Sequence, residues 1–71
     1  SPNQGNGQAS LMPAIDRETV FLTLLTVEEA LSQMQLEKRE ALPFRNRASG
    51  QCSLLYKKGT GRIGLIELSN A

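Results

Sequence analysis

The chain has 71 residues, which is enough for one domain and no more. Its 8 Lys and Arg side chains nearly balance its 7 Asp and Glu side chains, and the net charge of +1 gives no overall attraction to nucleic acid or to an anionic membrane. It has no histidine and a single cysteine, Cys52, so an internal disulfide is excluded and a metal site is not expected. No apolar run approaches the roughly 18 residues that a membrane span needs.

Residues 1–16 have the composition of a flexible linker. Gln, Asn, Gly, Ser and Pro dominate the first part, and Pro13 interrupts the few apolar residues that follow. The chain begins at Ser1-Pro2 without an initiator Met, so we expect a piece of a longer protein or a chain left by removal of a tag. We therefore predict one folded domain over residues 17–71.

A first strand is predicted over Arg17 to Leu25, where apolar side chains alternate on both faces. A strand with one face in water is not expected to have two apolar faces. Residues 26–29 then form a capping box: the side chain of Thr26 accepts from the backbone N–H of Glu29, and the side chain of Glu29 accepts from the backbone N–H of Thr26. The apolar spacing that follows predicts a helix over residues 27–38.

Three short strands are predicted after the helix, over residues 42–47, 51–58 and 62–68, separated by glycine-containing turns. The order is β-α-β-β-β. The predicted fold class is therefore α+β, with one helix on a four-stranded, mainly antiparallel sheet.

The apolar surface of this sheet exceeds what one helix of about three turns can cover, and so small a domain is often stabilised by oligomerisation. The surplus face therefore predicts a symmetric homodimer, with a monomer covered by its own tail or a flanking domain as the alternative. One assignment leaves Phe21, Leu25, Leu55, Ile66 and Leu68 as the surplus set, and the reverse assignment remains open. The candidate interface residues are Val20, Phe21, Leu22, Leu24, Phe44, Leu55, Ile63, Ile66 and Leu68.

No catalytic, cofactor or small-molecule site is expected. Residues 59–64 match G-x-G-x-x-G, but a dinucleotide site needs a helix to follow, and a tight hairpin explains these glycines better. Cys52 alternates with apolar residues and has no histidine to activate it. The basic residues of the hairpin are explained either by an RNA contact or by a solvated edge whose charges oppose aggregation: Lys57, Lys58 and Arg62.

Three blocks of the sequence resemble, in order and spacing, the C-terminal domain of the long-form ribosome hibernation-promoting factors (the sigma-54 modulation, or ribosome-associated stress protein, family). They are Leu25-Thr26-Val27-Glu28-Glu29-Ala30-Leu31-Ser32-Gln33-Met34, then Phe44-Arg45-Asn46 with the turn ending at Ser49-Gly50, then Leu54-Leu55-Tyr56-Lys57-Lys58 with Gly64-Leu65-Ile66-Glu67.

The resemblance implies a β-α-β-β-β homodimer that pairs two ribosomes into an inactive dimer and so represses translation under stress. In such proteins a separate N-terminal domain binds the ribosome, and the location is the bacterial cytoplasm or the plastid stroma. This sequence departs from the family pattern between Lys38 and Pro43, where the family usually has Gly-His-Asp and two aromatics, and at Ile63, where it usually has an aromatic. These departures motivate an alternative, a module of the same fold that docks on a non-ribosomal partner.

Overall fold

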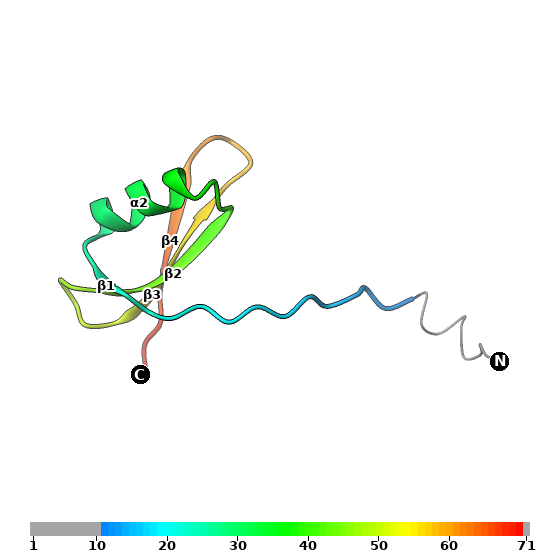
Figure 1. Cartoon of the computed structure of the whole chain (residues 1–71), viewed down its shortest axis with the longest axis horizontal. Helices are drawn as coiled ribbons and strands as arrows, with labels where there is room; N and C mark the ends of the chain where they lie inside the picture. The colour runs from blue at the N-terminus through cyan, green and yellow to red at the C-terminus, as the bar shows by residue number, and fades with distance from the viewer. Residues whose placement is uncertain (1–10, 71) are drawn as a thin grey trace.

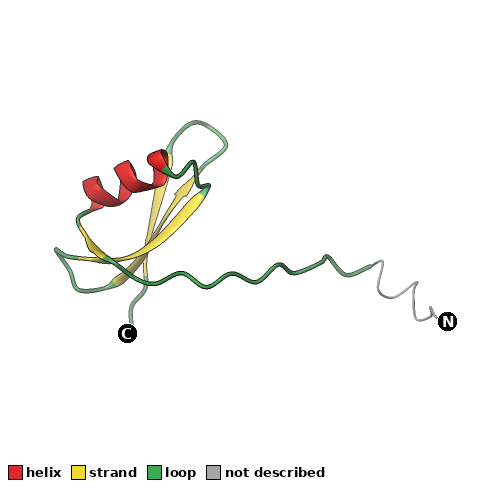
Figure 2. Ribbon diagram, in the orientation of Figure 1, coloured by secondary structure: helices red, strands yellow, loops and turns green. Residues whose placement is uncertain are grey.

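A computed structural model describes residues 11–70 of the chain, so residues 1–10 of the predicted linker lie outside the described part. One helix packs on a four-stranded sheet (Figures 1 and 2), which confirms the predicted α+β class. The elements in chain order are β1 (Leu24–Leu25), α2 (Val27–Leu36), β2 (Ala41–Asn46), β3 (Cys52–Lys57) and β4 (Ile63–Glu67).

The strands lie side by side in the order β1-β2-β3-β4. The β2–β3 and β3–β4 pairs are antiparallel hairpins, whereas β1 pairs with β2 in parallel. A parallel pair needs a crossover connection, and α2 supplies it. The sheet is therefore mixed, mainly antiparallel, as predicted.

The helix begins at the predicted capping box. The Thr26 N–H donates to the Glu29 carboxylate over 2.9 Å, and the Glu29 N–H donates to the Thr26 hydroxyl over 3.0 Å. The helix ends at Leu36, earlier than predicted, because Lys38 adopts a left-handed backbone with φ of 56°. A side chain at such a position is unfavourable, which is why glycine is the usual residue after a helix.

The core lies between α2 and one face of the sheet. Phe44 of β2 and Met34 of the helix are fully buried, and Leu55 of β3 is nearly so. The core cluster consists of Ala30, Met34, Leu42, Phe44 and Leu55. A cluster of this size stabilises one side of the sheet and leaves the other side without a partner element.

The predicted first strand is wrong for residues 17–23, because β1 contains only Leu24 and Leu25. The N–H of Arg45 in β2 donates to the carbonyl of Thr23 over 2.9 Å, and the N–H of Arg47, just after β2, donates to the carbonyl of Leu25 over 2.8 Å. The next bond of this ladder would need a donor at Pro43, which has no N–H. Pairing therefore stops there, and residues 13–22, the N-terminal arm, extend away from the domain (Figure 1).

We expect Lys38→Gly to stabilise the domain by about 0.5–1 kcal/mol, because a β-carbon in the left-handed region costs about 1–2 kcal/mol and part of the gain is lost to the flexibility of glycine when unfolded. The matched control is Glu37→Gly, where φ is −84°. That change is expected to destabilise the domain by a similar amount, about 0.5–1 kcal/mol. Urea unfolding measures both, and the same sign for the two variants contradicts the account.

Candidate functional site: an apolar sheet face

The side chains on the face of the sheet opposite α2 form a continuous apolar surface, here called the open face. Cross-strand partners share a face, and neighbours along a strand point to opposite faces. Because Phe44 and Leu55 lie beneath the helix, the register assigns the alternate residues to the open face. These are Leu24, Ala41, Pro43, Arg45, Cys52, Leu54, Tyr56, Gly64, Ile66 and Leu68.

No described element covers the open face, because α2 lies entirely on the other side of the sheet (Figure 1). Leu24, Ile66 and Leu68 are 50%, 43% and 57% exposed. Leu54, Cys52 and Tyr56 are half-buried by their neighbours on the same face. Apolar groups gathered in this way on a small domain mark a surface that binds another molecule.

The ring of Tyr56 lies over Gly64, its cross-strand partner on β4. A β-carbon at position 64 would come within 2.3 Å of the ring. Gly64 therefore permits the ring to lie close to the sheet backbone instead of projecting from it. Because the ring does not project from the sheet, another surface can approach the centre of the open face.

Positive charge is sparse on the open face. Arg45 is the one residue of the set that carries a formal charge, and its guanidinium donates to the carbonyl of Gly50 over 2.8 Å. The bond holds the charged group toward the β2–β3 turn, away from the apolar centre. Two such faces can therefore meet with little like-charge repulsion.

The structure separates the predicted interface residues into groups. Leu24, Ile66 and Leu68 lie on the open face. Ile63 lies on the helix side of β4 but is 39% exposed, because α2 packs against the other three strands and not, among the described elements, against β4. The arm carries Val20, Phe21 and Leu22.

The remaining two predicted interface residues, Phe44 and Leu55, belong to the core beneath α2 and are 0% and 2% exposed. The reason is the register. Leu42 and Phe44 of β2 pair with Leu55 and Ser53 of β3, so both strands direct these side chains to the helix. The uncovered face instead carries the alternate residues of these strands, Leu54 among them.

Lys57, Lys58 and Arg62 gather at the β3–β4 hairpin, where they line a shallow hollow of about 340 Å³ together with Gln35, Gly61 and Ile63. The ion pairs of the described residues involve other cations, Arg39 with Glu18 and Arg47 with Glu29. Within the described part of the chain these three cations are therefore free to meet an external anion.

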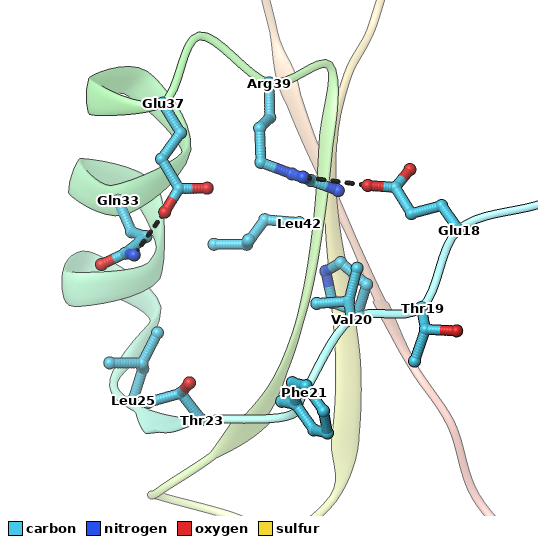
Figure 3. A pocket seen from close by; sticks show the side chains of 11 residues that line it. Glu18, Thr19, Val20, Phe21, Thr23, Leu25, Gln33, Glu37, Arg39 and Leu42 are labelled. Atoms are coloured by element: carbon cyan, nitrogen blue, oxygen red, sulfur yellow. Dashed lines mark hydrogen bonds and ion pairs between the residues drawn. The ribbon is translucent and has the colours of Figure 1, made fainter.

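A groove of about 350 Å³ lies between α2 and residues 18–21, the part of the arm nearest the sheet (Figure 3). Leu42 lies between the two walls, and Arg39 crosses to Glu18 of the arm at 3.2 Å. Gln33 and Glu37 bond to each other on the helix wall. The groove is open, and residues 11–70 contain no group of His, Cys, Asp and Glu able to hold a metal ion.

Comparison with known proteins places the chain in a family. The family model described as "Sigma 54 modulation/S30EA ribosomal protein C terminus" matches residues 13–65, which include the arm, the helix and most of the sheet. No curated protein matches the chain. Among the described residues, no helix is long and apolar enough to cross a bilayer.

We expect Gly64→Ala to displace the Tyr56 ring from the sheet, at a cost of about 1–3 kcal/mol for overpacking if the ring stays in place. The chain has one tyrosine and no tryptophan, so its intrinsic fluorescence reports on this ring alone. Quenching by acrylamide should increase in Gly64→Ala. The control is Gly59→Ala, since a β-carbon there has nothing within 4 Å. Equal quenching in both variants contradicts the assigned packing.

Proposed function

Because this chain belongs to the Sigma 54 modulation/S30EA ribosomal protein C-terminal family, we propose that it is a homodimerisation domain that joins two ribosomes into an inactive pair. The observation that carries this proposal is the open face, an apolar sheet surface that no described element covers. The role is structural, and no chemical step is assigned to any residue.

The second copy is the occupant that best fits this surface. Two sheets pack face to face about 10 Å apart when their facing side chains are apolar. The centre of the open face is formed by Leu54, Tyr56 and Ile66, with Leu24 and Leu68 nearer its ends. A two-fold axis through this centre brings each apolar group onto the equivalent patch of the other copy. Burial of this surface also supplements a small core.

Pairing of ribosomes follows from this geometry if a further domain of each protein is bound to a ribosome. One homodimer then holds two ribosomes together, and both are withdrawn from translation, as expected under stress. The resemblance implies that this further domain lies N-terminal to the arm. The arm is extended, so it connects the two parts without forcing a close contact between them.

Ile66→Lys is expected to raise the dissociation constant of the homodimer by well over tenfold, since burying an unpaired ammonium costs several kcal/mol and about 1.4 kcal/mol corresponds to tenfold. Light scattering over a concentration series measures the change. Leu36→Lys is the matched control, because Leu36 is 82% exposed on the helix and away from the sheet. The control should remain dimeric. A wild-type chain that is monomeric at high micromolar concentration contradicts the proposal.

The same pair of variants tests the role on ribosomes. Sucrose gradients of stressed cells should show paired ribosomes with the wild-type protein and with Leu36→Lys, and single ribosomes with Ile66→Lys. If all three profiles are the same while the purified chain dimerises, the ribosome role fails. The alternative then stands, a module of the same fold that docks on a non-ribosomal protein.

Lys57, Lys58 and Arg62 form a second candidate surface, for ribosomal RNA, because none of them has an ion pair among the described residues. Cations that meet phosphates release counterions, so the slope of log K against log salt should fall by about 0.7–0.9 for each lost contact. We expect Lys57→Ala/Lys58→Ala/Arg62→Ala to reduce this slope for ribosome binding. The control is Lys57→Arg/Lys58→Arg/Arg62→Lys. An unchanged slope in the alanine variant favours the solvated-edge explanation.

A further inference from the structure

The helix layer leaves β4 uncovered. Among the described elements, α2 packs against β1, β2 and β3 but not against β4. Leu65 pairs with Leu55, which lies beneath the helix, so Leu65 and its alternate neighbour Ile63 lie on the helix side of β4. They are 41% and 39% exposed. Apolar side chains of β4 therefore remain accessible beside the helix, on the side of the sheet away from the open face.

The β3–β4 hairpin closes one end of this uncovered strip. Figure 1 shows the turn of the hairpin next to the C-terminal end of α2. The Lys58 N–H donates to the Arg62 carbonyl over 2.8 Å, so the two strands stay paired as far as the turn. Gly61 completes the turn with φ of 82°, a conformation that favours glycine. The hollow of about 340 Å³ lies between this hairpin and Gln35 of the helix, and Ile63 is part of its wall.

Positive charge surrounds the hollow without a compensating carboxylate. Lys57, Lys58 and Arg62 line it and are exposed, and its lining contains no Asp or Glu. The groove between α2 and the arm differs, because Glu18 and Glu37 are in its walls. Three exposed cations without an ion pair among the described residues make the hollow a site for an anionic ligand.

The side chains around the hollow fit a nucleotide better than a bare anion. Lysine and arginine bind phosphate oxygens, and a guanidinium plane can also stack on a base. The exposed side chain of Ile63 offers an apolar contact to the face of a base, and the amide of Gln35 can both donate to and accept from its edge. A hollow of about 340 Å³ has room for one base. Bases are free to enter such a site in a single strand, where they are not held in a paired stack.

We propose that this hollow binds one unpaired nucleotide of a single-stranded RNA, with the base against Gln35 and Ile63 and the neighbouring phosphates on Lys57, Lys58 and Arg62. This inference rests on the proposed RNA surface and deepens it. A strand fits better than a free nucleotide, because it brings phosphates on both sides of the base to three cations. The hollow faces away from the open face, so it stays accessible in both copies of the proposed homodimer.

Binding of a short, dye-labelled single-stranded RNA to the whole chain tests the site, with fluorescence anisotropy as the measurement. We expect a strand of equal length whose sugars carry no bases to bind at least about fivefold more weakly, because it keeps the phosphates and loses the contacts of the base. The ring current of a base against Ile63 should also shift the methyl NMR signals of this residue. The base-free strand and a duplex of the intact sequence should leave these signals in place.

A pair of matched variants locates the site. Gln35→Glu places a carboxylate in the hollow at an exposed position, and we expect it to raise the dissociation constant of the intact strand by roughly three- to tenfold. Gln51→Glu is the control, because it makes the same chemical change at an exposed position in the turn between β2 and β3, outside this hollow. It should bind nearly as the wild type does. Equal weakening in both variants contradicts the assignment to the hollow.

The outcomes separate the nucleotide site from the surface on which it rests. If the base-free strand or a polyglutamate of equal length binds as tightly as the RNA, the nucleotide site is overturned and a general anion surface remains. If a free nucleoside monophosphate shifts the Ile63 methyl signals at the same concentration as the strand, the choice of RNA is overturned. If no strand binds, the RNA surface and the nucleotide site fail together, while light scattering still decides the homodimer independently.

Discussion

The architecture depends on the coverage of a sheet by a single helix. A sheet has two faces, and α2, a helix of 10 residues, packs against one of them. Phe44 and Leu55 on the covered face are buried, together with Met34 of the helix. The opposite face carries side chains of the same kind without a cover, including Leu54 and Ile66. The free-energy cost of leaving such a surface in water is the physical basis of the proposed homodimer.

The two edges of the sheet differ as the two faces do: one is closed to a partner and the other is open. Pro43 and Arg39 close the β2 edge beyond β1, whereas β4 has no comparable device. A chain that blunts one edge and not the other directs any added strand to the second. Faces and edges together therefore describe a small sheet with one uncovered face and one edge that no described residue pairs.

Much of this fold could be predicted from the sequence, because its signals are local. The capping box from Thr26 to Glu29 marks the start of the helix, and the period-2 patterns place β2, β3 and β4 within about one residue of their observed ends. The absence of histidine likewise argues against a metal site from composition alone. The family resemblance rests on blocks that coincide with these same elements.

The features that the sequence did not predict depend on pairing between distant segments. Pro43 shortens β1 only because β1 lies beside β2, and a parallel neighbour is not visible from local pattern. Leu55 and Leu54 both look like core residues, and the cross-strand register alone decides that Leu55 meets the helix. Lys38 shortens the helix because it adopts a left-handed backbone conformation, which a lysine in the sequence does not predict. The open face was therefore expected, but with part of its membership reversed.

The most direct test of the central claim is an isotope-filtered NOE experiment on a mixture of labelled and unlabelled chains, which detects only contacts between copies. The account predicts intermolecular NOEs from the methyl groups of Leu54, Ile66 and Leu68, and none from Leu36 on the helix. Intermolecular NOEs that arise from the helix surface instead, with none from the open face, would contradict it.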